Sequence, residues 1–288
     1  SNHEKYSGFP VIMAILLYTF QLYMDFAGCI NIARGSAQLF GITLEENFKR
    51  PFFATSVNEF WRRWHITLGA WFKDYIFYPI SLGTHFQKFS QNCRKHMNRY
   101  YAATIPGIFA LFAVWFGNGI WHGAEWKYII YGLYYYVIMV LGMLLEPAFV
   151  RFCSKLNIDR NASWYHTMQV VRTFILVNIS WFFDRADTVG QAFHMMKLSV
   201  TKFAPSQLLL IPAGKEGTAF TPYALAILAA GCIILFIVSV LQERGMKIRE
   251  SLAGLSLPIT VAIYFCLLAS IGFFGSTAVA RGFIYAQF

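Results

Sequence analysis

Long runs without Asp, Glu, Lys or Arg constrain this sequence more than any other feature. Five such runs cover 6–24, 100–124, 128–145, 217–242 and 251–280, and a sixth apolar stretch, 163–183, is interrupted only by Arg172. An α-helix needs roughly 20 apolar residues to cross the hydrocarbon core of a bilayer. The pattern therefore predicts an all-α, polytopic membrane protein with about six transmembrane helices.

The composition agrees with this interpretation. Charged residues make up 13% of the 288 residues, hydrophobic residues make up 57%, and the mean hydropathy is +0.47. Soluble domains carry about 25% charged residues. Because no repeat or low-complexity linker divides the sequence, we expect residues 1–288 to form a single membrane-embedded domain. The five cysteines include no close-spaced pair, so no metal site is expected.

Basic residues gather in three short connections, which we expect at 83–100, 149–162 and 243–250. Excess Lys and Arg in short loops marks the cytoplasmic side of a membrane protein. The net charge of +10 therefore indicates orientation in the membrane, and no nucleic-acid partner is expected. Pairs of spans separate the connections, which places all three on one side. His65 then lies toward the cytoplasm, and His122 lies near the outer end of its helix.

The segment 52–83 is too charged for a simple span, yet it is rich in aromatic residues. Its apolar residues recur at steps of three and four, which is typical of an amphipathic helix. Glu59 can pair with Arg62 or Arg63 at helical spacing, and Gly83 is expected to end the helix. Such a helix lies in the membrane interface or enters the membrane as a re-entrant element.

Two histidines are candidates for chemistry. His122 lies in GNGIWHGAEW at the end of an apolar run, where a structural histidine beside interfacial tryptophans is one interpretation. A reactive site is the other, because ionisable groups within spans often mark such sites. Gly117, Gly119 and Gly123 leave room for a ligand to approach the ring closely. His65 follows two arginines and gives a weaker signal by itself.

The two segments together match a known pattern. NEFWRRWHITLGAWFKDYIFYPI followed by NGIWHGAEW resembles the membrane-bound O-acyltransferase family. The resemblance is strongest to its bacterial branch, which holds the alginate O-acetyltransferases and the D-alanyl transfer protein of teichoic-acid modification. QLYMDFAGCINIARGSAQLFGITLEENFKRPF and the terminal RGFIYAQF are similar to the same branch, so the resemblance runs from about Leu22 to the end of the sequence.

The resemblance implies roles for particular residues. His122 corresponds to the catalytic histidine of the Trp-His-Gly motif, and His65 corresponds to the second signature residue. Asp25 matches the Asp-Phe-Ser/Ala-Gly turn of the family, whereas Asn31 stands where members commonly have another Asp.

Two further departures concern the length and the acceptor. Members are longer at the N-terminus, so the chain is expected to lack the N-terminal helices of the family. Many alginate-type members also carry Gly-Asn-Arg where this sequence has the residues 84–86, which weakens the case for alginate as the acceptor.

The chemistry of acyl transfer accounts for such residues. A hydroxyl that attacks a thioester must lose a proton, and a neutral imidazole, with an ordinary pKa of about 6.5, suits that task near neutral pH. Asn118 lies four residues before His122 and so shares its helix face. It is a candidate oxyanion donor or support for the ring, and the alternative is a polar residue satisfied by a neighbour. Trp121 is the other supporting candidate.

The sequence thus predicts a multi-pass O-acyltransferase of the plasma membrane. It would move an acyl group, acetyl first and D-alanyl second, to a hydroxyl of an extracytoplasmic polymer or partner protein. No bound cofactor is expected, because the thioester donor, coenzyme A or acyl carrier phosphopantetheine, is a substrate. Arg62 and Arg63 would attract its anionic arm. Expected partners are the bilayer, a cytoplasmic acyl carrier protein and an extracytoplasmic acyltransferase or acceptor. The alternative is a non-catalytic transporter-like or scaffold subunit.

Overall fold

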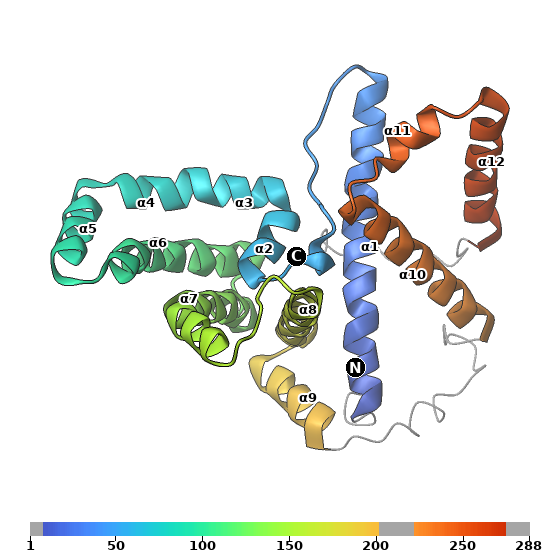
Figure 1. Cartoon of the computed structure of the whole chain (residues 1–288). Coiled ribbons are helices and arrows are strands. Elements are labelled where there is room, and N and C mark those ends of the chain that lie inside the picture. The colour runs from blue at the N-terminus through green and yellow to red at the C-terminus, as the bar shows by residue number, and fades with distance from the viewer. Residues whose placement is uncertain (1–7, 202–221, 275–288) are drawn as a thin grey trace. The chain divides into compact units, whose positions relative to one another are not determined.

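The computed structural model describes residues 8–201 and 222–274, and within these ranges the chain is almost wholly helical and has no strand beyond one isolated bridge (Figure 1). The described residues divide into two compact units, 8–201 and 222–274. The predicted all-α, polytopic membrane architecture is confirmed.

The first unit contains the two candidate histidines and most of the helices. In chain order these helices are α1 (Phe9–Leu39), α2 (Val57–Arg63), α3 (Ile66–Phe72), α4 (Tyr78–Leu82), α5 (Thr84–His96), α6 (Arg99–His122), α7 (Trp126–Lys155), α8 (Ser163–Arg185) and α9 (Val189–Thr201). A 3₁₀ turn, Pro51–Phe53, precedes α2, and a π-helical turn, Lys73–Phe77, joins α3 to α4.

Helices long and apolar enough to cross a membrane are fewer than the sequence predicted. Within the described ranges, four meet both conditions: α1, α6, α7 and the part Ala226–Glu243 of α10 (Pro222–Glu243). The predicted span 163–183 does form a helix of sufficient length, α8, but α8 does not meet the hydropathy condition. Its polar residues lower its hydropathy, namely His166, Gln169, Arg172 and Asn178.

Helices α6 and α7 form an antiparallel hairpin that is tightly packed near its turn. Gly119 of α6 faces the backbone of Tyr128, whose carbonyl oxygen would lie 2.8 Å from an added Cβ. Gly132 of α7 likewise faces the carbonyl oxygen of Trp115, with no room for a methyl group. Small residues at such a crossing let two helix backbones approach closely, as is common between membrane helices.

Helices α3 and α4 and the π-turn between them run alongside α6, and α5 closes this layer at the far end (Figure 1). The predicted connection 83–100 is therefore wrong in its structure, because thirteen of its residues form α5. No Gly or Pro interrupts residues 84–96, and Arg94 and Lys95 in the last turn favour the helix dipole.

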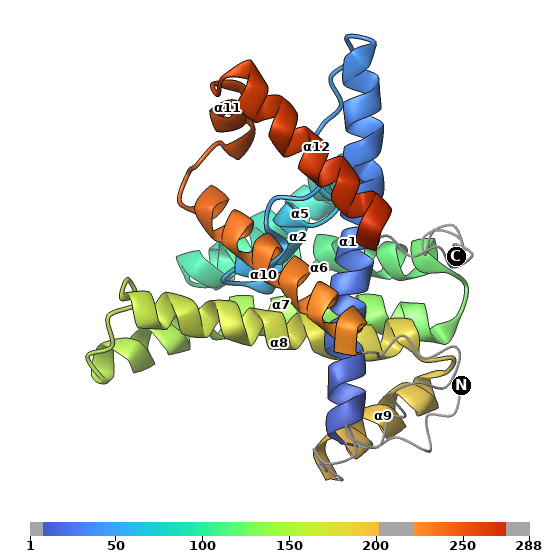
Figure 2. The same cartoon turned by 90° about the vertical axis from the view of Figure 1, so that its right-hand side faces the viewer.

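Helix α1 crosses α8 and also contacts α9 (Figure 2). Two side-chain hydrogen bonds fix this crossing. The Thr19 hydroxyl donates to Oδ1 of Asn178 at 2.7 Å, and the Tyr18 hydroxyl donates to Oδ2 of Asp184 at 2.6 Å. The sequence analysis did not predict this polar contact between α1 and α8.

The second unit contains α10, α11 (Ile248–Ala253) and α12 (Leu257–Phe274). The predicted span 251–280 is not one helix, because the turn at Gly254 separates α11 from α12. Residues 275–280 lie outside the described residues, as does the beginning of the span predicted at 217–242. Large apolar side chains cover the surface of α10 and α12, which suits contact with lipid.

The close α6–α7 contact predicts a specific sensitivity to added volume. Gly132→Ala should destabilise the folded protein by about 1–3 kcal/mol, as overpacking commonly does, because the new methyl group would overlap the backbone of Trp115. Thermal unfolding of the purified protein in detergent measures the change. The matched control is Gly142→Ala in the same helix, where nothing lies within 4 Å of an added Cβ. Equal unfolding temperatures for the two variants would contradict the predicted packing.

The basic residues at the ends of α5 and α7 give a prediction of orientation. In a cysteine-free background, single cysteines replacing Lys95, Lys155 or Lys247 should resist an impermeant maleimide in sealed cells. A cysteine replacing Glu125, in the turn between α6 and α7, should react. Permeabilised cells provide the control, because every position should react there. Labelling of the cysteine at position 95 in sealed cells would show that the orientation in the membrane is the reverse of the predicted one. The outward position expected near Lys215 lies outside the described residues.

Candidate active site

The chain breaks sharply between α2 and α3, at Trp64 and His65. Trp64 is extended (φ −109°, ψ 126°), and His65 has left-handed backbone angles (φ 48°, ψ 55°). The segment 47–49 pairs with this break: the Lys49 amide donates to the Arg63 carbonyl oxygen at 2.9 Å, and the Ile66 amide donates to that of Asn47 at 3.1 Å. The prediction of one continuous amphipathic helix is therefore wrong here.

The two residues of the break take opposite environments. Trp64 is only 2% exposed, and its ring packs against those of Phe60 in α2, Phe48 and Trp181. His65 instead lines a cavity. Within this sharp turn, one side chain packs in the core and the next lines the cavity.

Helix α2 is held at its start by polar contacts. The Ser56 hydroxyl accepts from the Glu59 amide at 3.1 Å, which caps the helix. The Glu59 carboxylate accepts from Thr55 and also from Nη2 of Arg63 at 2.6 Å. Burial raises the pKa of Glu59, but these hydrogen bonds outweigh it and hold the pKa below its ordinary value. Of the two predicted partners of Glu59, Arg63 is thus confirmed.

His65 is held on several sides. Its Nδ1 lies 3.1 Å from Oδ1 of Asn47, the Phe26 ring meets it edge-on at 4.7 Å between centroids, and the Trp121 ring lies at 6.2 Å. Burial lowers the pKa of His65 to about 4. The imidazole is therefore neutral at physiological pH, with one ring nitrogen protonated.

His122 is the last residue of α6 and lies among aromatic rings. The centroid of its ring is 4.9 Å from that of Trp121, 5.3 Å from that of Tyr131 and 6.1 Å from that of Tyr128. An added Cβ at Gly123 would lie 2.8 Å from the Tyr128 ring. The glycines at 119 and 123 were expected to admit a ligand, but the space beside them is filled by α7.

Trp121 brings the two histidines together, because its ring contacts both imidazoles. The sequence analysis placed His65 toward the cytoplasm and His122 near the outer end of its helix. Since the two rings share one neighbour, at least one of these placements is wrong. The break before α3 returns His65 to the C-terminal end of α6.

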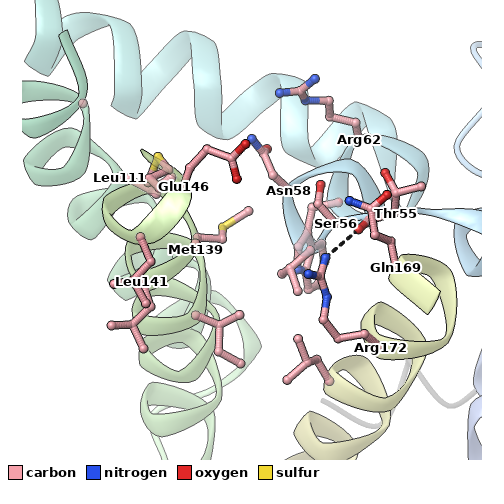
Figure 3. A pocket seen from close by; sticks show the side chains of 18 of the residues that line it. Thr55, Ser56, Asn58, Arg62, Leu111, Met139, Leu141, Glu146, Gln169 and Arg172 are labelled. Atoms are coloured by element: carbon pink, nitrogen blue, oxygen red, sulfur yellow. Dashed lines mark hydrogen bonds between the residues drawn. The ribbon is translucent and has the colours of Figure 1, made fainter. Parts of the chain in front are cut away.

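A cavity of about 1530 Å³ lies between α2, α3, α6, α7 and α8. Figure 3 shows polar side chains gathered on one side of it, where Arg172 donates from Nη2 to the Thr55 carbonyl oxygen at 2.8 Å. Leu111, Met139 and Leu141 line the other side together with Glu146 (Figure 3), whose carboxylate accepts a hydrogen bond from Arg160. The cavity is therefore amphipathic, and its volume exceeds the roughly 300–1,000 Å³ of typical pockets for small organic ligands.

The predicted arginine pair separates in the structure. Arg62 is exposed and lines the cavity, whereas Arg63 is bound to Glu59 and donates from Nη1 to the Arg50 carbonyl oxygen at 3.3 Å. Arg63 therefore stabilises the fold around the break. Arg172, which the sequence analysis treated only as an interruption of a span, lines the cavity with Arg62.

Asn118 and Asp25 take different positions. Asn118 is 5% exposed and borders the cavity, and its Oδ1 has no hydrogen-bond partner within the described part of the chain. The alternative of an amide satisfied by a neighbour therefore does not hold for that oxygen. Asp25 is half-buried in α1, beside Phe26, and is not among the residues that line the cavity.

Three residues of the site were missed by sequence reasoning: Asn47, Phe26 and Tyr131. Asn47 approaches His65 from a segment 18 residues earlier, and no periodicity reveals such a contact. Tyr131 belongs to an apolar run that contains several tyrosines, so nothing in the sequence distinguishes it from its neighbours.

Comparisons with known proteins relate the sequence to membrane-bound acyltransferases. Residues 4–92 match the family model described as MBOAT, membrane-bound O-acyltransferase family. A probable alginate O-acetylase of Pseudomonas putida is 35% identical over 183 residues, which cover 64% of this chain and 32% of the relative. A peptidoglycan O-acetyltransferase of Helicobacter pylori is 29% identical over 96% of this chain and 49% of its own length.

A third relative has a different named acyl group. The teichoic acid D-alanyltransferase of Bacillus subtilis is 32% identical over 177 residues, covering 62% of this chain and 40% of the relative. The chain thus spans about a third to a half of the length of these curated relatives. Together, the matched model and these alignments confirm that the chain is similar to the membrane-bound O-acyltransferase family, as its motifs predicted.

Proposed function

We propose that this multi-pass membrane protein carries the reaction centre of an O-acyltransferase. The observation that supports the proposal is the convergence of His65 and His122 on Trp121, next to a cavity that His65 lines. His65 comes from the break before α3 and His122 from the end of α6, and both are signature positions of the family that the chain resembles. His65 lines the amphipathic cavity, and His122, which is not among the lining residues, is connected to His65 through the Trp121 ring. Such a pair of imidazoles suits proton transfer during acyl transfer.

His122 would act as the general base. Its neutral imidazole takes the proton of the acceptor hydroxyl as the hydroxyl oxygen attacks the thioester carbonyl carbon. The tetrahedral intermediate then collapses, the carbon–sulfur bond breaks, and the imidazolium returns the proton to the departing thiolate. The products are an O-acyl ester and a free thiol, so one base completes the cycle. Tyr128 and Tyr131 restrict the ring of His122 through their contacts.

The cavity is proposed to receive the thioester donor. A phosphopantetheine arm is elongated and combines amides and methylene groups with an anionic phosphate. The cavity offers apolar side chains and three arginines, of which Arg160 is paired with Glu146. Arg62 and Arg172 would bind the phosphate through charged hydrogen bonds. Arg63 has no such role in this proposal, because Glu59 holds it. The same chemistry fits coenzyme A and an acyl carrier protein.

The acceptor is proposed to be a hydroxyl of an extracytoplasmic polymer or partner protein, with acetyl as the first choice of acyl group and D-alanyl as the second. The named acceptors of the relatives are alginate, peptidoglycan and teichoic acid, and two of the three relatives are named for acetyl transfer. The relative that aligns over nearly the whole chain is the peptidoglycan O-acetyltransferase.

The test of the proposed base is His122→Gln in the intact protein. An amide fills a similar volume but accepts no proton, so turnover of an acetyl thioester should fall about 10²–10⁴-fold, the usual contribution of a general base. The unfolding temperature should change little. The matched control is His166→Gln on the exposed face of α8, which should keep full activity. Near-normal turnover by a well-folded His122→Gln protein would favour a transporter-like or scaffold role instead.

The test of the donor site is Arg62→Gln. A hydrogen bond to a charged group contributes about 1.5–3 kcal/mol, so KM for acetyl coenzyme A should rise roughly 10-fold or more. KM for a short acetyl thioester without phosphate should not change. Arg151→Gln on the exposed surface of α7 is the control. Equal changes with both thioesters would contradict a phosphate contact at Arg62.

A separate variant, His65→Ala, should weaken productive use of the thioester donor more than it changes the acceptor requirement.

A further inference from the structure

The amide oxygen of Asn47 collects three hydrogen bonds beside the candidate site. It lies 3.1 Å from Nδ1 of His65, 3.2 Å from the backbone nitrogen of Thr67 and 2.7 Å from the Thr67 hydroxyl. Asn47 is 8% exposed, so this cluster is shielded from water. A buried amide in such a cluster has a defined orientation, and that orientation decides which nitrogen of His65 carries the proton.

The backbone of Thr67 removes the ambiguity that asparagine amides usually carry. The oxygen and nitrogen of an amide are interchangeable by shape alone and must be assigned from their partners. A backbone N–H can only donate, so the Asn47 atom that faces Thr67 must be the oxygen. The same oxygen faces Nδ1 of His65. Since an amide oxygen only accepts, Nδ1 must be the donor and carry the proton.

We propose that Asn47 is a positioning residue that holds His65 in the tautomer with its proton on Nδ1, so that Nε2 presents an unprotonated lone pair to the substrate in the cavity. The catalytic part of this statement rests on the proposed function, because it assumes that a substrate meets His65. The tautomer itself follows from the hydrogen bonds to Asn47 and does not depend on any activity.

The backbone around His65 supports a site rather than a simple turn. A non-glycine residue with left-handed angles costs on the order of 1–3 kcal/mol, and glycine would adopt the φ of 48° at less cost. The chain nevertheless places a histidine there. The segment 47–49 holds the residues on either side of it, Arg63 and Ile66, through two backbone hydrogen bonds. Asn47 therefore contacts the His65 ring with its side chain and the next residue, Ile66, with its backbone carbonyl oxygen.

Nitrogen-15 NMR of the histidine-labelled intact protein tests the tautomer directly. At neutral pH the His65 signals, assigned by their loss in His65→Gln, should show Nδ1 protonated and Nε2 unprotonated. Asn47→Asp keeps an acceptor and should preserve this pattern, whereas Asn47→Ala should lose it. Asn31→Ala, at an exposed asparagine of α1, should have no effect. A proton on Nε2 in the unaltered protein would overturn the proposal, even if Asn47→Ala fails to fold.

A double-mutant cycle separates positioning from a purely structural role. Asn47→Ala should lower kcat for acetyl transfer about as much as His65→Ala, and adding it to His65→Ala should cause no further loss, because it acts through that ring. Asn47→Asp should restore most of the rate. If the losses of kcat in the two single variants instead multiply in the double variant, and the unfolding temperature falls to match, Asn47 is not a positioning residue. His65→Ala could also keep full activity while the NMR spectra still show the proton on Nδ1. In that case the proposed role of His65 in acyl transfer is wrong, but the assignment of its tautomer is correct.

Discussion

The short backbone pairing between 47–49 and the end of α2 is the constraint on which the site depends. It ends a helix that the side-chain pattern alone would continue, and it makes Trp64 and His65 point in opposite directions. Without the break, both would follow the helical surface, and neither the aromatic core nor the cavity would have its central residue. The cost of a left-handed histidine is therefore offset by packing on one side and hydrogen bonds on the other.

Ring contacts connect this break to the second histidine. The centroid of the Trp64 ring lies 5.9 Å from that of Trp181, which lies 6.1 Å from that of Tyr131, and Tyr131 lies 5.3 Å from His122. Aromatic rings suit this task, because they fix geometry through area and shape without adding charges to an apolar interior. The positions of the two histidines are therefore coupled through packed rings, in addition to their shared contact with Trp121.

Local patterns in the sequence predicted the parts of the structure that depend on local interactions. The uncharged runs indicated α6 and α7, and helical spacing indicated the pair of Glu59 and Arg63. The break at His65 depends on Asn47, 18 residues earlier, and the apolar period continues through it without a signal. The glycines of α6 were visible, but a sequence does not say whether a helix or a ligand occupies the space beside them.

The two candidate histidines lie far from the segment in which this sequence departs from its alginate-type relatives. The relatives carry different names for acyl group and polymer, yet they align with the same chain. The departure from alginate-type members falls at 84–86, at the start of α5. Helix rise along α3 and α4 places that point roughly 25 Å from His65, too far to contact the reacting groups. The difference therefore lies away from the two candidate histidines, at the opposite end of this helical layer.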